Sequence, residues 1–331
     1  MFSEDLMEMK KPGGTPPDIV CAGVICADIM VRAVDRLPER GKLALVDGLS
    51  MHIGGCAANA AIDLARLGAG TAILGRIGAD GFGSFLSAAL EREGVDTRGL
   101  KRSDTPSSAS VVSIGSDAER SILHCLGANG EFCYGDIDRS IITGSGIVFI
   151  AGTFLMPSFD GSGTAALLRD AKAVGALCCM DTAWDASGKW MKKIEGCLEL
   201  LDWFMPSYEE AAALSGEQDP ERIAAAFIRE GAANVAIKLG AEGCYVKPAG
   251  GKGFSVATYS SVPVVDTSGA GDAFCAGFLM GLTKGWDPHR CAQLANAVGT
   301  HCIMAVGTTT GIRPLSEILT FMDNEGRQVN K

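Results

Sequence analysis

The feature that most constrains the fold of this chain is a regular alternation of short apolar runs with amphipathic stretches. The runs have the length of strands, and the stretches between them carry apolar residues at helical spacing. This alternation is typical of strands and helices wound into a mostly parallel sheet. We therefore predict an α/β protein, and at 331 residues the chain is long enough to bury a large core.

The same pattern places the individual elements. Strands are expected over Val20 to Val31, Thr71 to Ile77, Ile147 to Ala151, Leu177 to Asp181, Asp202 to Met205 and Val235 to Leu239. Helices are expected over Ala57 to Leu67, Phe82 to Glu93, Gly163 to Val174, Pro220 to Arg229, Gly271 to Leu282 and Pro288 to Met304. No long linker, low-complexity tract or repeat interrupts the pattern, so residues 1–331 are expected to form a single domain.

Two regions, residues 42–53 and 108–126, break the alternation. In residues 42–53, and again in 108–114 and 121–125, apolar and polar residues alternate one by one. Half-exposed antiparallel strands have this pattern, because successive side chains point to opposite faces of a sheet. The turn-rich stretch 115–119 joins the two parts of the second region.

Composition excludes several classes of protein. Charged residues make up 21% and hydrophobic residues 47% of the chain, which is typical of a globular protein rather than a disordered one. The formal charge of −10 argues against a nucleic-acid partner, because no basic stripe is present to neutralise phosphates. The first eleven residues carry acids and lack an apolar core, and no run reaches membrane-spanning length. We expect a cytoplasmic protein that does not bind a membrane.

The twelve cysteines do not indicate a disulfide framework or a metal site. They are scattered through apolar segments without any Cys-x-x-Cys pair, and the chain holds only four histidines. In a reducing compartment a free cysteine behaves as a small hydrophobic side chain. We therefore expect core positions for the cysteines in apolar runs, which are Cys21, Cys26, Cys178, Cys179, Cys244 and Cys302.

The most informative motif is Asp-Thr-Ser-Gly-Ala-Gly-Asp-Ala-Phe at residues 266–274. A strand-like run, Val262 to Val265, leads into its Gly-Ala-Gly turn, which opens an apolar helix. Backbone N–H groups at a helix start lie at the positive end of the helix dipole, and Gly269 and Gly271 allow a phosphate to approach the main chain closely. Asp272 adds a carboxylate to this anion site. The alternative is a well-capped helix behind a turn, since an acid in the first turn also stabilises a helix.

A second glycine-rich segment, residues 54–61, begins Gly-Gly and runs into a helical apolar pattern that ends before Gly68. Its small residues admit a ligand beside the helix start. Asn59 lies in the first turns and offers both a donor and an acceptor, which suits a hydroxyl-bearing ligand. The alternative is a strand-to-helix turn with a polar surface asparagine.

Together the two segments resemble the two signatures of the ribokinase-like (PfkB) carbohydrate kinase family. Three weaker matches follow in the family's order: the opening strand 19–28 that ends in an acid, the segment 204–210 and the segment 237–243. The resemblance covers nearly the whole chain. It implies a three-layer ribokinase-like fold with a mostly parallel central sheet flanked by helices. It also implies that residues 42–53 and 108–126 form a small β-strand lid over a sugar site.

The resemblance further implies an ATP-dependent sugar kinase that transfers the γ-phosphate to a primary hydroxyl of a small carbohydrate. Asp272 would accept the proton of that hydroxyl, while the backbone N–H groups of Gly269, Ala270 and Gly271 hold the transferring phosphate. ATP and Mg²⁺ are the implied cofactors. Glu210 would order the water shell of Mg²⁺, although Ser207 stands where the family more often has asparagine. Alternatively, Glu210 belongs to a solvated helix start.

The remaining implied site residues fall into three groups. For ATP they are Lys238, Gly240, Gly243 and Asn296. For the acceptor they are Asp28, Gly54, Gly55, Asn59 and Asn129. Asp266 and Thr267 fall where many relatives bind K⁺ through backbone carbonyls, which leave no side-chain signature. Lys238 could instead be solvated, and Asn129 could be a turn residue. Asp181 also ends a strand and is expected to face the cleft, with no role assigned.

The acceptor itself stays open at this stage. Ribose-specific relatives usually carry Gly-Gly-Lys-Gly-Ala-Asn-Gln, and this chain lacks both the lysine and the glutamine. A fructokinase-like or 2-keto-3-deoxy sugar acid kinase-like activity is expected, with a ribose or nucleoside kinase as the alternative. A non-catalytic sugar-binding protein on the same fold is a second alternative. Lid strands in relatives often pair between subunits, so a homodimer is expected.

Two other enzyme classes are disfavoured. A nicotinamide-dependent oxidoreductase needs Gly-x-Gly-x-x-Gly directly after the first strand, whereas Gly23 is followed here by Val-Ile-Cys-Ala-Asp. A P-loop kinase needs Gly-x-x-x-x-Gly-Lys followed by serine or threonine, which the sequence does not contain.

Overall fold

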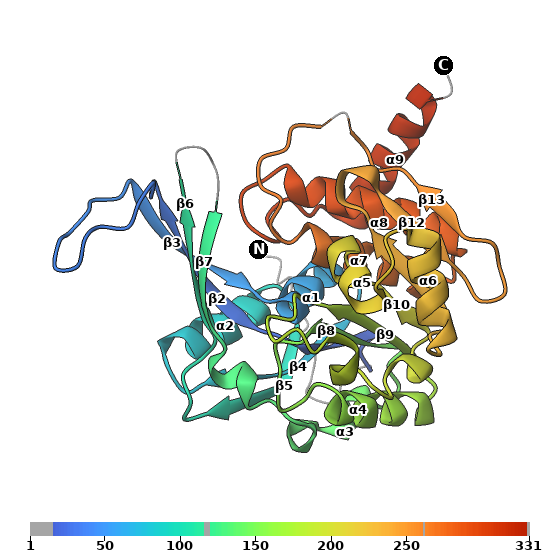
Figure 1. Cartoon of the computed structure of the whole chain (residues 1–331), viewed down its shortest axis with the longest axis horizontal. Helices are drawn as coiled ribbons and strands as arrows, with labels where there is room; N and C mark the ends of the chain where they lie inside the picture. The colour runs from blue at the N-terminus through green and yellow to red at the C-terminus, as the bar shows by residue number, and fades with distance from the viewer. Residues whose placement is uncertain (1–15, 116–119, 261, 330–331) are drawn as a thin grey trace, which may run out of the picture.

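The computed structural model describes residues 16–115, 120–260 and 262–329 (Figure 1). In this part of the chain the main body is a nine-stranded sheet with the order β13-β12-β11-β10-β9-β8-β1-β4-β5. Seven neighbouring strands of this sheet run parallel, namely β5, β4, β1, β8, β9, β10 and β11. Beyond β11, strands β12 and β13 are added antiparallel. The bounds are β1 Ile19–Gly23, β4 Thr71–Gly78, β5 Asp96–Ser103, β8 Ile147–Thr153, β9 Leu177–Thr182, β10 Trp203–Phe204, β11 Asn234–Lys238, β12 Cys244–Lys247 and β13 Phe254–Val256.

Helices cover both faces of this sheet, so the body has three layers. On one face lie α1 Cys56–Arg66, α2 Gly81–Arg92, α7 Ala270–Thr283, α8 Pro288–Ile303 and α9 Leu315–Val329, which contribute to one buried apolar cluster. On the other lie α3 Arg139–Ile142, α4 Ser162–Ala173, α5 Tyr208–Ser215 and α6 Pro220–Arg229, which contribute to a second cluster. Strands buried on both faces explain why the sequence shows continuous apolar runs. The predicted ribokinase-like α/β fold is confirmed.

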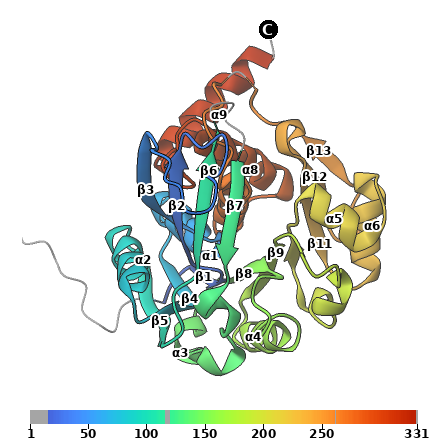
Figure 2. The same cartoon turned by 60° about the vertical axis from the view of Figure 1, so that its left-hand side comes forward.

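A second sheet of four strands, here called the lid, projects from the body (Figure 1), and Figure 2 shows its strands side by side. The order is β3-β2-β6-β7, with bounds β2 Cys26–Arg32, β3 Gly48–Gly54, β6 Ala109–Ile114 and β7 Arg120–Cys125. The pair β2 and β6 is parallel, and the other two pairs are antiparallel. The regions 42–53 and 108–126 therefore contribute three strands of the lid, and β2 completes it.

Three strand predictions need correction. Val20 to Val31 is not one strand, because the chain leaves the main sheet after Gly23 and enters the lid as β2. Gly23 has φ +148°, and a Cβ there would lie 2.0 Å from the carbonyl oxygen of Ala151, so this exit depends on glycine. Val262 to Val265 forms no strand. The strand expected over residues 42–53 begins only at Gly48, so residues 42–47 lie outside it.

The six cysteines that were expected in the core are all buried, which confirms that prediction. Among the described residues, no helix combines the length and the apolar character that crossing a membrane requires.

Candidate active site

The Gly-Ala-Gly turn opens helix α7 as the sequence predicted. Gly269 is the residue before the helix and has φ +78°, and a Cβ there would lie 2.4 Å from the carbonyl oxygen of Thr308. Ala270, Gly271 and Asp272 are the first three residues of α7. Asp272 thus lies in the first turn, where the helix dipole favours negative charge.

A hydrogen bond joins the two glycine-rich motifs. The side-chain amide of Asn59, in helix α1, donates to Oδ2 of Asp272 at 2.8 Å. The carbonyl oxygen of the same amide accepts from the hydroxyl of Thr308 at 2.9 Å. Asn59 is only 3% exposed, so it is not the surface asparagine of the alternative interpretation. Its amide fixes the orientation of the Asp272 carboxylate.

The environment of Asp272 favours a base stronger than an ordinary aspartate. Burial raises the pKa of the Asp272 carboxyl, while the hydrogen bond from Asn59 and the charge of Lys238 act in the opposite direction. The net direction is upward, which matches a group that has to accept a proton near neutral pH.

Lys238 and Asp181 form a buried ion pair at the carboxyl ends of β11 and β9. The Nζ atom of Lys238 lies 2.7 Å from Oδ1 and 2.6 Å from Oδ2 of Asp181. Burial opposes the charge of the ammonium, but the carboxylate of Asp181, together with Cys275 and Glu210, outweighs it, and the pKa of Lys238 is raised. Lys238 is therefore neither solvated nor free, and a phosphate beside it would meet an ammonium that Asp181 holds in place.

One cavity of about 1190 Å³ gathers most of the residues that the sequence singled out. Its lining includes Asp181 and these predicted residues: Glu210, Lys238, Gly240, Gly243, Thr267, Gly269, Ala270, Gly271, Asp272 and Asn296. Of the two residues expected near a monovalent cation, Thr267 lines the cavity. Asp266 is not part of the lining, and its carboxylate accepts hydrogen bonds from the backbone of Ser268 and Gly307.

Glu210 and Asn296 both line this cavity, and the side chain of each also forms hydrogen bonds with main-chain groups. Glu210 accepts from the backbone N–H of Ser207 at 3.2 Å and from the hydroxyl of Thr182 at 2.9 Å. Ser207 and Glu210 form a capping box at the start of α5, as the alternative for Glu210 anticipated in part. Asn296 is 4% exposed and donates to the carbonyl oxygens of Val256 and Ala257.

The expected acceptor residues lie where the lid meets the body. Asp28 does not end the first strand of the main sheet, as the sequence suggested, but is the third residue of β2 in the lid. A Cβ on Gly54 would lie 1.9 Å from Oδ2 of Asp28, so glycine at position 54 makes room for that carboxylate. Gly55 has φ +92° and is the residue before helix α1. Asp28, Gly54 and Gly55 are thus brought together at the end of α1 that carries Asn59.

Asn129 is buried next to the lid, at the point where the chain passes from the main sheet into it. It is 1% exposed, and its side-chain amide donates to the carbonyl oxygen of Ile25 at 2.9 Å and accepts from the N–H of Ile25 at 3.3 Å. Ile25 lies between β1 and β2, which is where the chain passes from the main sheet to the lid. The side chain of Asn129 therefore clamps this connection.

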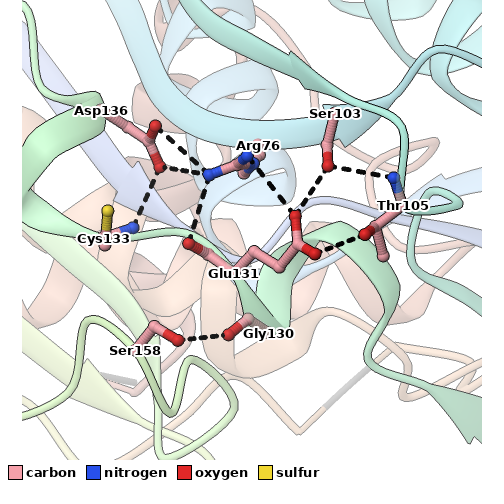
Figure 3. Close-up of polar contacts among 8 residues, drawn as sticks. All are labelled: Arg76, Ser103, Thr105, Gly130, Glu131, Cys133, Asp136 and Ser158. Carbon is pink, nitrogen blue, oxygen red and sulfur yellow. Dashed lines mark hydrogen bonds and ion pairs between the residues drawn. The ribbon is translucent and has the colours of Figure 1, made fainter.

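The segment after Asn129 is held to the sheet by a polar cluster that the sequence analysis missed (Figure 3). Glu131 accepts from the hydroxyls of Ser103 and Thr105 and lies 3.4 Å from a guanidinium nitrogen of Arg76. Arg76 also donates to Asp136. Nothing in the local pattern pairs these residues, because Arg76 lies on β4 and its partners follow far along the chain.

The family model described as pfkB family carbohydrate kinase matches residues 17–314. An uncharacterized sugar kinase of Archaeoglobus fulgidus is 32% identical over 75% of this chain and 97% of its own length. The 2-dehydro-3-deoxygluconokinase of Bacillus subtilis is 28% identical over 86% of this chain and 90% of its own length.

A solved structure of a carbohydrate kinase has the same fold as this chain. The ribokinase of Arabidopsis thaliana, complexed with ribose and ATP, superimposes with a TM-score of 0.82 and is 26% identical, and the match covers 93% of this chain and 99% of that one. The match of the family model to most of the chain, together with the geometry around Asp272, leads to one conclusion. The chain belongs to the pfkB family of carbohydrate kinases, and it is an ATP-dependent phosphotransferase that acts on a sugar.

Proposed function

We propose that the protein transfers the γ-phosphate of ATP to a primary hydroxyl of a small carbohydrate, in the manner of a fructokinase or a 2-keto-3-deoxy sugar acid kinase. The observation that carries this proposal is the hydrogen bond from Asn59 to Asp272 at the start of α7. It positions a carboxylate of raised pKa beside a helix N-terminus, which pairs a base with donors for anionic oxygens. The name of the B. subtilis relative supports the sugar acid, and that of the A. thaliana ribokinase keeps ribose as the alternative.

In the proposed reaction, Asp272 accepts the proton of the acceptor hydroxyl as the oxygen attacks the γ-phosphorus. The backbone N–H groups of Gly269, Ala270 and Gly271 stabilise negative charge on the transferring phosphoryl oxygens. Lys238 adds positive charge, and Gly240, Gly243 and Asn296 line the part of the cavity that would take the nucleotide.

A magnesium ion fits the oxygen donors of this cavity. Both Glu210 and Asp181, which lies at the end of β9, line the cavity and bring a carboxylate to it. Hard cations prefer such ligands and keep several waters, so we assign Glu210 to the water shell of Mg²⁺, which supplies charge neutralisation on the polyphosphate. For K⁺ we keep Asp266 and Thr267, where backbone carbonyls would bind. Dependence of the rate on added K⁺, against Na⁺ at equal ionic strength, tests this assignment.

The test of the kinase proposal is ATP consumption across ketoses, aldoses, keto-deoxy sugar acids and nucleosides, measured beside Asp272→Asn. We expect one acceptor to be phosphorylated, and the variant to lose at least about two orders of magnitude in turnover, the usual effect of removing a general base. Its melting temperature and ATP affinity serve as controls for folding. An Asp272→Asn enzyme with near-normal turnover would contradict the assignment. Phosphorylation of none of these acceptors by the wild type would contradict the proposed acceptor classes.

We also propose that two lids pair in a homodimer. The outer face of the lid exposes Leu49 and Leu123, which are 69% and 68% exposed, together with Met51. The strand register places Met51 and Leu49 opposite Ile29 and Val31 on the same face. Exposed apolar faces of this kind mark interaction surfaces. Light scattering that shows only a monomer at micromolar concentration would refute the dimer.

We place the activity in the cytoplasm, where ATP is available and free thiols stay reduced. The twelve cysteines, all free in the structure, are consistent with such a compartment. Fractionation of cells with an antibody against the protein tests this location.

A further inference from the structure

A row of four polar side chains crosses the lid from one edge to the other. The register pairs Asp28 of β2 with His52 of β3 on one side and with Ser110 of β6 on the other. Ser110 in turn pairs with His124 of β7. Residues directly opposite one another in adjacent strands point to the same face of a sheet and lie close enough to interact. The order along the row is therefore His52, Asp28, Ser110 and His124.

Contacts within the lid link three members of this row, because Cys26 lies between Asp28 and Ser110 and its Sγ atom is 3.5 Å from Oδ1 of Asp28. The hydroxyl of Ser110 lies 3.1 Å from Nδ1 of His124 and 3.3 Å from the Sγ atom of Cys26. Ser110 is 7% exposed and Asp28 is half-buried, whereas the ring of His124 at the end of the row is exposed. The centre of the row is thus held in place and its His124 end is accessible to a ligand.

The face that carries the row is turned toward the catalytic residues. Gly54, at the point where β3 passes into α1, lies against the Asp28 carboxylate. At the β3 edge, a Cβ on Gly307 would be 3.7 Å from Nδ1 of His52, so the row reaches the loop that precedes Thr308. Thr308 bonds Asn59, which bonds Asp272. A molecule that presents a hydroxyl to Asp272 would therefore lie beneath this face.

We propose that this row reads the hydroxyl groups of the acceptor, and that His124 is a specificity-determining residue that contacts one of them. The proposal rests on the proposed kinase function and names the chemistry by which the lid recognises the sugar. Imidazole and serine hydroxyl groups both donate and accept hydrogen bonds, as sugar hydroxyls do, and Asp28 accepts two. A carboxylate placed against the row would instead be repelled by Asp28.

The surroundings of His124 favour the neutral ring that such a contact needs. His124 is accessible to solvent, but the lid shields part of its ring. This partial burial lowers the pKa of the His124 imidazole, and the charge of Asp28 opposes the shift in part. With the pKa below its usual value, the ring is mostly uncharged at neutral pH and can donate through one nitrogen and accept through the other.

The experiment compares wild type with His124→Ala and with Ser121→Ala as the matched control. Ser121 is also exposed on β7, but it pairs with Ser113 and so points to the opposite face. For the best acceptor of the panel, we expect His124→Ala to raise the acceptor KM roughly tenfold, the effect of losing one good hydrogen bond. The KM for ATP should not change, His124→Gln should restore part of the affinity, and Ser121→Ala should behave as wild type.

Deoxy analogues of the same acceptor identify the contact. For the wild type, kcat/KM should be about tenfold lower with one of these analogues than with the parent acceptor. For His124→Ala the same analogue should change kcat/KM little, because the hydrogen bond from His124 is already lost. Equal losses for every analogue in both enzymes, an unchanged acceptor KM in His124→Ala, or the same loss in Ser121→Ala would each overturn the proposal. Calorimetry measures the affinity for the acceptor without ATP, so the effect of His124→Ala on binding can be determined even when turnover is absent. Failure of the kinase proposal therefore stays distinguishable from failure of the proposed role of His124.

Discussion

At the scale of single residues, the candidate active site depends on the hydrogen bonds of one side-chain amide, that of Asn59. Asn59 could have offered its amide to a ligand, but the structure commits both ends of it, to Asp272 and to Thr308. The amide therefore positions the Asp272 carboxylate and lowers its pKa in part, against the larger effect of burial. The expectation that Asn59 also contacts the sugar stays a prediction.

This arrangement predicts the pH dependence of turnover. Asp272 must be ionised to accept a proton, and its pKa is raised by burial, so kcat should fall with decreasing pH at higher pH than an ordinary aspartate would allow. The hydrogen bond from Asn59 lowers this pKa in part. Asn59→Ala should therefore move the acid limb of the kcat profile to still higher pH.

Steady-state kinetics between pH 5 and 9 measure this shift. Thr308→Val serves as a comparison, because it leaves the donor to Asp272 in place and removes only the hydroxyl that holds the amide. An acid limb that does not move in Asn59→Ala, or that moves downward, would contradict the assigned role.

At the scale of elements, helix α1 carries two polar side chains on its buried face. Asn59 is satisfied, whereas neither carboxyl oxygen of Asp63, one turn further on, has a hydrogen-bond partner within the described residues. Asp63 is fully buried, and burial raises its pKa well above the usual value, with the charge of Asp272 adding to the shift. An unpaired buried carboxyl group costs stability and needs an explanation.

Asp63 should make the protein less stable as the pH rises. The unfolded chain releases the proton near pH 4, whereas the folded protein holds it to higher pH, so stability falls as the pH rises from about 4 through the raised folded pKa. Asp63→Ala removes this cost. Its melting temperature should exceed that of the wild type at pH 8, by the equivalent of about 1 kcal/mol or more, and the difference should shrink at pH 5.

Asp104→Ala is the matched control, because Asp104 is exposed and the substitution removes the same formal charge. It should leave the melting temperature nearly unchanged at both values of pH. Destabilisation of Asp63→Ala at pH 8 would show that the carboxyl group has a stabilising partner.

At the scale of the whole molecule, we expect acceptor binding to depend on how the lid is attached to the main sheet. The chain passes between the two sheets at Ile25, and Asn129 holds both backbone groups of that residue. The cluster around Arg76 and Glu131 fastens the next turn of the chain to β4 and β5 (Figure 3). The connection between the lid and the body is thus held by the buried side chain of Asn129 and by a partly exposed polar cluster beside it.

Asn129→Ala should loosen this connection before any sugar is bound. Hydrogen exchange of the β2 and β7 amides in the ligand-free protein should become faster, and the acceptor KM should rise while the KM for ATP stays close to the wild-type value. A residue that only contacts sugar would leave exchange in the ligand-free protein unchanged. That result would support the acceptor role that the sequence suggested for Asn129.

The sequence by itself determined the layers, the family and the position of Asp272 in the first turn of a helix. Apolar runs of strand length mark a sheet that is buried on both faces, and the motif at residues 266–274 needs only local chemistry, namely two glycines and an acid at a helix start. The helix at Gly271 and the lid strands over 108–126 were found in the same way. Each of these features is encoded by neighbours in the chain.

Only the tertiary structure decided how these parts are joined. It divided the run from Val20 to Val31 between two sheets at Gly23, where the constraint is the carbonyl group of Ala151, far along the chain. It paired Lys238 with Asp181, used Asn129 as a clamp and brought His52, Asp28, Ser110 and His124 into one row. These contacts depend on strand order and register, which are set when distant segments pack, and no local pattern of residues contains them.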